Sequence, residues 1–410
     1  HLYALHLAAG GRILPDHAVT IFDEAHKLEA ASSAAFGVDV GGGRVTAFAN
    51  NAQRLLDPSR RDKLVGELRA AAARLNQDIA ALPEERLDPA AGPPGDAILG
   101  AIRAIGEAGR ALPKVDEAEP RAGAIARVKS QGGHVQADFG WALDLPENTV
   151  AWAEPSRRVI RVAPISVDLP IASNLLVHVP TILTSATLTT GGSFAPLAGR
   201  LGLTRQEVRE DPAAVDVADP LSRTYDELRV DGSFDYARQG LLYVASQLPD
   251  PRDEAWPAAA AAEIRQLVEA SGGRALVLTT SYRMLETVAA GLGDVPFDLL
   301  VQGTVPKRQL IAEFADNETS TLIATMGYWE GIDVPGASLS LVVIDRIPFP
   351  RPDDPLMEAR REAVAARGGS PFDEVDLPRA TILMAQGAGR LIRNERDSGV
   401  VAVLDRRLTA

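Results

Sequence analysis

Short apolar runs alternate with helix-like segments over the second half of the chain, and this order restricts the fold more than any other feature. The runs expected to form strands cover residues 181–184, 274–279, 298–301, 321–325, 340–344 and 399–404. Segments with helical spacing lie among them, at residues 193–201, 282–292, 307–314 and 375–392. Strands that alternate with helices pair in parallel and are covered on both faces. The pattern therefore predicts an α/β fold.

A further strand is expected far upstream, at residues 17–22, and a helical region separates it from the others. Ala, Leu and Arg recur at helical spacing in three stretches broken by prolines: 44–56, 60–82 and 96–112. The β-branched runs on either side of Pro155 are typical of a hairpin. We therefore expect a mainly helical insertion at residues 37–164, inside an α/β region.

The composition of the chain excludes several classes of site and of protein. The chain has no cysteine, which excludes disulfides, thiolate zinc sites, cysteine nucleophiles and iron–sulfur ligation within it. The net charge of −13 argues against a simple nucleic-acid coat but leaves room for a local basic groove. Neither a membrane-spanning run nor a signal peptide is recognisable, so we expect a cytoplasmic protein without a membrane partner. Because the chain begins with His1 instead of Met, we expect it to be a fragment.

The tetrapeptide Asp-Glu-Ala-His at residues 23–26 directly follows the first expected strand. Acids at the carboxyl end of a strand lie where open α/β sheets bind ligands. One carboxylate can hold Mg²⁺ through water while its neighbour activates the water that attacks a phosphate. An acidic pair that merely begins a helix gives the same pattern.

Two hydroxyl residues, Ser185 and Thr187, follow the strand at 181–184. Their hydroxyls can bond the acidic pair across an adjacent strand and relay the state of a bound nucleotide. The more common use of such residues is to satisfy backbone groups in a turn.

A glycine-rich segment at residues 327–336 follows the strand at 321–325. Gly331 permits close approach of the backbone to a phosphate or ribose. Asp333 can bind a sugar hydroxyl or an arginine. A Gly/Pro loop around a buried Trp is the alternative interpretation.

The segment at residues 386–393 places polar groups at helical spacing. The positions i, i+3, i+4 and i+7 belong to Gln386, Gly389, Arg390 and Arg393, and they predict one helix face. Two guanidiniums beside an amide suit the charge on a transferred phosphoryl group. A basic stripe in solvent, paired with acids, is the alternative.

Taken in this order, the four segments resemble motifs II, III, V and VI of superfamily 2 helicases, in particular the DinG/XPD group of ATP-dependent DNA helicases. Residues 347–350 also match that group, and residues 277–282 resemble its motif IV. The long gap between Asp23 and Ser185 corresponds to the arch that this family inserts between motifs II and III.

The resemblance implies an architecture of two RecA-like motor domains with parallel sheets, the first incomplete, and a mainly helical arch. The implied bounds are 1–36 for the part of the first motor domain with motif II, 37–164 for the arch, 165–219 for the return to the first motor domain with motif III, and 220–410 for the second motor domain. The family's phosphate loop and any cysteines for a 4Fe–4S cluster would lie upstream of His1, so we expect the chain alone to be inactive.

The resemblance also implies roles. Asp23 is expected to bind Mg²⁺ through water, Glu24 to act as the catalytic base, and His26 to couple hydrolysis to movement. Gln386, Arg390 and Arg393 are expected at the γ-phosphate. Gly331 and Asp333 fall in the segment that links ATP to the grip on DNA, and Ser185 and Thr187 fall in motif III.

The function implied is an ATP-dependent DNA helicase with ATP and Mg²⁺ as cofactors, expected to move 5′ to 3′ in repair or replication. Its expected partners are single-stranded DNA and forked or tailed duplexes. Two alternatives stay open from the residues: a non-hydrolysing nucleic-acid-binding protein on a helicase scaffold, and a translocase that does not unwind.

Overall fold

The computed structural model describes residues 2, 3, 6, 13–116, 119–176, 179–205, 224–230, 232, 234–328 and 338–409. The chain divides into two units, each of which packs on itself. The first comprises His1–Ala186, Ala195–Asp226 and Arg351–Pro371, and the second comprises Thr187–Phe194, Glu227–Pro350 and Phe372–Ala410. Residues 351–371 thus group with the first unit, although their neighbours in sequence belong to the second. The four-part domain division expected from the resemblance stays a prediction.

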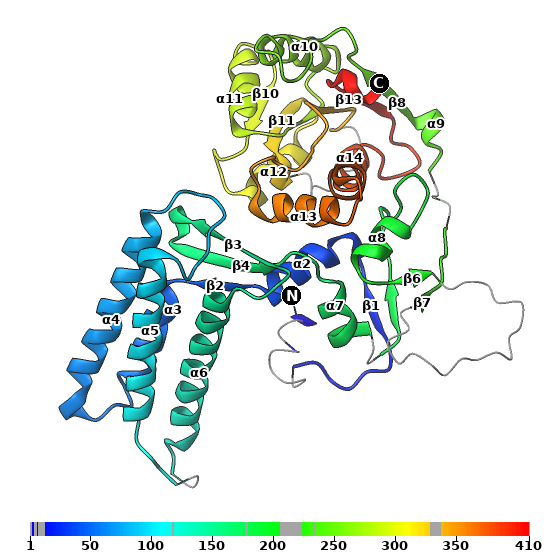
Figure 1. The fold of residues 1–410 in the computed structure, drawn as a ribbon. Coiled ribbons are helices and arrows are strands. Elements are labelled where there is room, and N and C mark those ends of the chain that lie inside the picture. The colour runs from blue at the N-terminus through cyan, green and yellow to red at the C-terminus, as the bar shows by residue number, and fades with distance from the viewer. Residues whose placement is uncertain are drawn as a thin grey trace, which may run out of the picture. The chain divides into compact units, whose positions relative to one another are not determined.

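A helical part of the first unit contains α3 (Gly42–Ala52), α4 (Pro58–Ala80), α5 (Gly92–Ala111) and α6 (Ala122–Asp144). Helices α4, α5 and α6 lie side by side (Figure 1). They share an apolar core in which Phe48, Ile105 and Phe139 are buried. Helix α4 begins at Pro58, where the Asp57 side chain accepts a hydrogen bond from the Ser59 N–H, as a capping residue does.

An antiparallel sheet of order β2–β4–β3 packs on these helices. Its strands are β2 (Val38–Val40), β3 (Thr149–Glu154) and β4 (Val159–Pro164), and the turn η2 (Pro155–Arg157) joins the last two. The hairpin expected around Pro155 is therefore confirmed, and so are the helices expected at 44–56, 60–82 and 96–112. Helix α6 was not assigned from the sequence.

The remaining part of the first unit holds a parallel pair of strands, β1 (Thr20–Phe22) and β5 (Thr181–Leu183), with Thr20 opposite Thr181. The turn η1 (Ala25–Lys27) and helix α2 (Leu28–Phe36) follow β1 without a break. The other elements are α7 (Asp168–Ile171), the π-helical turn η3 (Ala172–Leu176), α8 (Ala195–Arg200), β6 (Thr204–Arg205), β7 (Thr224–Tyr225) and α13 (Pro355–Ala366).

The second unit is built on a parallel sheet of order β10–β11–β9–β12–β13–β8. Its strands are β8 (Gly240–Val244), β9 (Ala275–Thr279), β10 (Asp298–Val301), β11 (Ser320–Thr325), β12 (Leu341–Ile344) and β13 (Gly399–Val403). Every pairing among them is parallel. The strands expected at 274–279, 298–301, 321–325, 340–344 and 399–404 are confirmed, whereas β8 was not assigned.

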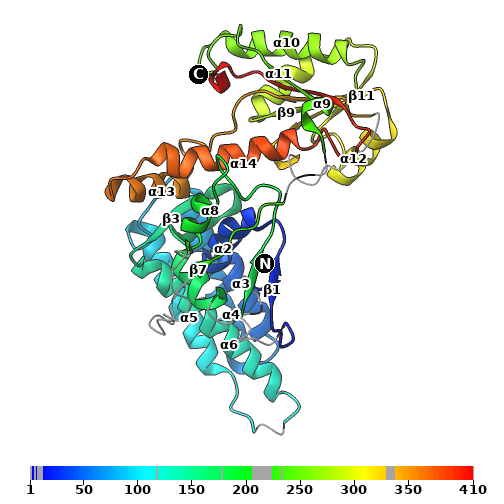
Figure 2. The same ribbon diagram turned by 90° about the vertical axis from the view of Figure 1, so that its right-hand side faces the viewer.

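Helices cover both faces of this sheet. Figure 2 shows α10 (Trp256–Ala270) and α11 (Tyr282–Gly291) on one side and α12 (Lys307–Asp316) on the other. Two apolar clusters match the two faces, because Ala275 and Val277 pack with α10 and α11, whereas Leu276 and Leu278 pack with α12. The remaining elements are α9 (Tyr236–Gln239), η4 (Met326–Tyr328), the π-helical turn η5 (Phe372–Asp376), α14 (Leu377–Ala388) and η6 (Arg406–Thr409). No helix in the described part of the chain is long and apolar enough to cross a membrane.

Candidate active site

The acidic pair lies where the sequence predicted it, at the carboxyl end of β1. The Thr184 N–H donates to the Phe22 carbonyl and the Ala25 N–H donates to the Thr184 carbonyl, at 2.9 and 3.0 Å. These bonds extend the parallel pairing past the ends of β1 and β5. They hold Asp23, Glu24 and Ser185 at one edge of the strand pair.

Glu24 has a backbone conformation that few side chains adopt. Its φ of 52° and ψ of 43° are left-handed, which costs a residue with a Cβ about 1 kcal/mol or more. The Glu24 N–H donates to Asp23 Oδ1 at 2.9 Å, so the turn is fixed by the preceding acid. Both acidic side chains are exposed at the strand end. The strained turn therefore presents two carboxylates to solvent.

A hydroxyl joins the Glu24 carboxylate to His26. The Ser185 Oγ–H donates to Glu24 Oε2 at 3.1 Å, and His26 Nδ1 lies 2.8 Å from the same Oγ. A hydroxyl has one proton, so both bonds form together when His26 Nδ1 is the protonated ring nitrogen. His26 Nδ1 also lies 3.2 Å from Glu24 Oε2, and its side chain is 4% exposed. The predicted contact between motif III and the acidic pair is thus present for Ser185.

Asp23 fits the role of a water-mediated magnesium ligand. One of its oxygens accepts the Glu24 N–H, and the carboxylate is exposed, so it can also meet the hydration shell of the ion. Among the described residues, no group of three or more His, Cys, Asp or Glu side chains could enclose a metal ion. Mg²⁺ needs few direct protein ligands, because it keeps several waters when it binds a nucleotide.

The predicted single helix face at residues 386–393 is wrong. Helix α14 ends at Ala388 and Gly389 is its C-cap, so Gln386 lies on the helix while Arg390 and Arg393 follow it. The carboxylate of Asp397 ends the helix by accepting hydrogen bonds from the N–H groups of Arg393 and Asn394, at 2.8 and 3.0 Å. Backbone donors that a further helical turn would use are thereby taken by a side chain.

Two residues outside the predicted site hold this loop. Gln239 Nε2 on α9 donates to the carbonyls of Asn394 and Asp397, at 3.0 and 2.9 Å. Asp397 is buried, whereas the sequence suggested an exposed partner for a basic stripe. Only the short spacing of Asp397 from Arg393 hinted at its role, and nothing local marked Gln239.

Three predicted residues remain: Thr187, Gly331 and Asp333. Thr187 begins the segment Thr187–Phe194 of the second unit. Gly331 and Asp333 lie outside the described residues. The chain leading to them is fixed, because Lys307 Nζ donates to the Gly327 carbonyl at 2.6 Å and lies 4.6 Å from the centre of the Tyr328 ring.

Motif IV lies against a buried acid at the carboxyl end of β12. Asp345 is fully buried and accepts hydrogen bonds from the N–H and hydroxyl of Thr280, each at 3.1 Å. The Arg346 N–H donates to its other oxygen at 2.7 Å. Burial raises the pKa of Asp345 to about 6, against the lowering effect of these bonds and of the Arg346 charge.

Replacing Asp345 with asparagine is expected to change how stability depends on pH. A raised pKa means that the folded chain holds this proton more tightly than the unfolded chain, whose carboxyl titrates near 4. The free energy of unfolding of the parent protein therefore falls as the pH rises from about 4 through 6, by at most ~3 kcal/mol relative to that of Asp345→Asn. Urea unfolding followed by fluorescence of the buried Trp256 measures this. An equal difference between the two proteins at pH 4 and pH 7 would contradict it.

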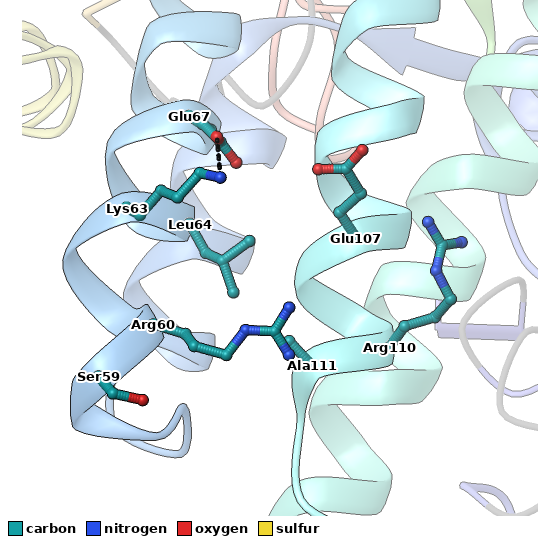
Figure 3. A pocket seen from close by; sticks show the side chains of 8 residues that line it. All are labelled: Ser59, Arg60, Lys63, Leu64, Glu67, Glu107, Arg110 and Ala111. Atoms are coloured by element: carbon teal, nitrogen blue, oxygen red, sulfur yellow. Dashed lines mark ion pairs between the residues drawn. The ribbon is translucent and has the colours of Figure 1, made fainter.

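A separate pocket of about 290 Å³ lies between α4 and α5. It is lined by Ser59, Arg60, Lys63, Leu64, Glu67, Glu107, Arg110 and Ala111. In Figure 3 the Arg60 guanidinium extends from α4 toward Ala111 of α5, and Lys63 pairs with Glu67, with 3.9 Å between Nζ and Oε1. Three cations therefore share this surface with two carboxylates.

Comparison with known proteins shows which proteins the chain is similar to. Residues 264–410 match the model of a helicase C-terminal domain. Over 421 aligned residues and 99% of its length, the chain is 36% identical to the ATP-dependent helicase DinG of Mycobacterium tuberculosis. Over 55% of its length it is 40% identical to the ATP-dependent DNA helicase YoaA of Escherichia coli, of which it covers 33%. These matches support the resemblance of the chain to helicases of the DinG/XPD type.

The fold of the chain is similar to that of a solved XPD helicase. The TM-score is 0.61 at 16% sequence identity, over 100% of the chain and 69% of the XPD helicase chain. At this identity the likeness shows the fold alone, and it confirms the expected α/β class with RecA-like parallel sheets. The chain spans 60% of the length of the mycobacterial DinG.

Proposed function

We propose that the chain is the part of an ATP-dependent DNA helicase that activates the hydrolytic water and stabilises the transferred phosphoryl group. The observation that carries this proposal is the bond network from His26 through Ser185 to Glu24. A carboxylate that only opened a helix would not need an oriented hydroxyl from another strand. The match to the mycobacterial and E. coli helicases supports the same assignment.

The geometry of the first unit supports the roles that the resemblance implies. Glu24 accepts the proton of the attacking water, and Ser185 and His26 fix the direction of its carboxylate. Asp23 holds the hydration shell of Mg²⁺, which neutralises charge on the phosphates when it is bound with ATP. Thr187 belongs to the same motif, and we assign it to relaying the nucleotide state.

The second unit supplies the positive groups. Gln386, Arg390 and Arg393 meet the γ-phosphate, where guanidiniums stabilise the charge of the transition state. Gly331 and Asp333 link that state to the grip on DNA. The product of this cycle is 5′ to 3′ movement along single-stranded DNA, with unwinding of forked or tailed duplexes. Because the chain contains no cysteine, any 4Fe–4S cluster would be held by other residues of the protein.

The test uses the full-length protein, ATP, Mg²⁺ and a fluorescent forked duplex. ATP hydrolysis that single-stranded DNA stimulates, together with strand separation, is the expected result. Stimulated hydrolysis without strand separation would support a translocase. DNA binding without hydrolysis would support a non-hydrolysing scaffold, and either result would reject the helicase assignment.

The helical part of the first unit is proposed to contact DNA phosphates through the pocket between α4 and α5. Replacing Arg60 and Arg110 together with alanine is expected to weaken binding of single-stranded DNA about tenfold and to lower the slope of log Kd against log salt by about 1 per lost phosphate contact. Titrations of labelled DNA at several salt concentrations measure both quantities.

The matched control for this pair is Arg103→Ala, because Arg103 is an exposed arginine of α5 outside the pocket. It is expected to leave both the affinity and the salt slope within twofold of the parent values. An unchanged salt slope in the Arg60/Arg110 double variant would show that the pocket does not bind phosphates.

A further inference from the structure

One buried carboxylate joins three helices of the first unit. Glu29 of α2 lies 2.9 Å from Nε of Arg200, the last residue of α8, through Oε2. Its other oxygen, Oε1, lies 2.9 Å from Nη1 of Arg360 on α13. The three side chains are 12%, 14% and 8% exposed, in that order. Glu29 therefore holds two guanidiniums in a site largely closed to water.

Arg360 is held at every nitrogen of its guanidinium. Nη1 meets Glu29, Nη2 donates to Ser33 Oγ at 2.8 Å, and Nε donates to the Ile165 carbonyl at 2.9 Å. Two of these partners belong to α2 and the third follows β4. A planar fork satisfies three separated acceptors at once, which an ammonium group cannot do with the same geometry. Helix α13 is thereby fixed in position and rotation on α2.

The contact between Glu29 and Arg360 joins two segments that adjoin predicted site residues in the sequence. Helix α2 continues directly from the Asp-Glu-Ala-His turn, since η1 ends at Lys27 and α2 begins at Leu28. Helix α13 lies between β12 and α14, both of the second unit, so the chain leaves that unit after Pro350 and returns to it at Phe372. The buried anchor thus connects the segment after Glu24 to the segment before Gln386.

Stability alone is a weak reason for such a contact. A buried ion pair often contributes no more than apolar side chains of the same volume, because removing both charges from water is costly. What the pair supplies is one permitted geometry, since a shifted α13 would separate the buried Arg360 guanidinium from Oε1 of Glu29 and leave that carboxylate with Arg200 alone.

We propose that Glu29 and Arg360 are positioning residues that couple the Asp-Glu-Ala-His turn to α14 through α13. A displacement of α2 when Glu24 engages or releases its substrate carries α13 with it, and α13 moves the start of the segment that bears Gln386. This inference rests on the proposed ATPase function.

The test is made in the full-length protein with Arg360→Lys, which keeps the charge but loses the fork. The expected result is that hydrogen exchange of the α13 amides becomes at least about tenfold faster. The KM for ATP stays within twofold, while the ratio of ATPase rates with and without single-stranded DNA falls about tenfold. This ratio does not change with the fraction of folded enzyme, so lower stability alone would leave it unaltered.

Arg361→Lys is the matched control, because its guanidinium donates to the carbonyls of Pro352 and Arg351 within the same segment. It is expected to leave the exchange and the ratio unchanged. Glu29→Gln should lower the ratio as Arg360→Lys does, and the double variant should lower it no further, because both changes weaken the same contact between Glu29 and Arg360.

Two outcomes separate this inference from the proposed function. A parent protein without DNA-stimulated hydrolysis would reject both the function and the coupling. A parent with normal stimulation, beside an Arg360→Lys variant with fast α13 exchange and an unchanged ratio, would reject the coupling alone. The contact would then serve the structure only.

Discussion

Replacing Arg393 with lysine in the full-length protein is expected to lower the DNA-stimulated rate of ATP hydrolysis about a hundredfold, and Arg393→Ala about a thousandfold. Lysine keeps the charge but not the planar pair of donors that matches phosphate oxygens. The hydrogen bond from the N–H of residue 393 to Asp397 should survive either change, because it comes from the backbone. Steady-state ATPase assays with saturating single-stranded DNA measure the effect.

Arg396→Lys is the control for this prediction, since Arg396 is exposed in the same loop and its N–H donates to the Asn394 side chain. We expect its rate to stay within twofold of the parent. If the Arg393→Lys variant hydrolysed ATP at the parental rate, Arg393 would not act at the γ-phosphate, and Arg390 would be the candidate for that role.

The strands and their ends were predictable because the information is local. Apolar runs such as the one at residues 275–279 are buried on both faces, and the acids at 23 and 24 follow a shorter apolar run, although Ile21 in its middle is exposed. A parallel pairing of β1 with β5 then brings Ser185 to Glu24 without any further assumption. This part of the candidate site could be predicted from sequence order alone.

The helix boundary at residue 388 was not predictable in the same way. The spacing of Gln386, Arg390 and Arg393 is truly helical, but Asp397 takes the N–H of Arg393, and the distant Gln239 holds the loop that follows through the carbonyls of residues 394 and 397. Tertiary hydrogen bonds overrode a correct local pattern. The same holds for α13, since Arg360 with its partners on α2, and Arg86 with Glu358 and Glu362, join it to the first unit, which no local pattern records.

Helix α6 was missed for a different reason. Its sequence contains paired glycines at its centre, which lower helix propensity. Gly132 is needed there because a Cβ would lie 2.8 Å from Cε2 of Phe48, a fully buried side chain of α3. Close packing against the neighbouring helix explains the glycine, and the packing energy outweighs the propensity.

Replacing Glu24 with glutamine is expected to lower ATP turnover in the full-length protein at least about a hundredfold, with ATP binding retained. Glutamine keeps the shape and can still accept the Ser185 hydroxyl bond, but an amide does not take a proton from water. The left-handed backbone at residue 24 is adopted by either side chain at similar cost, so the fold should not change. Binding of a fluorescent ATP analogue and single-turnover hydrolysis measure the two quantities separately.

Two further variants make the role of Glu24 specific. Glu147→Gln changes an exposed carboxylate of the first unit and should leave turnover within twofold, which controls for net charge. Ser185→Ala should lower turnover about tenfold, since the carboxylate remains but loses the hydroxyl that directs it. This order of effects distinguishes a base from an acid that only holds Mg²⁺, because loss of a metal ligand would weaken ATP binding in Mg²⁺ as well. Weakened binding in Glu24→Gln, or turnover at the parental rate, would therefore contradict the assignment of Glu24 as the base.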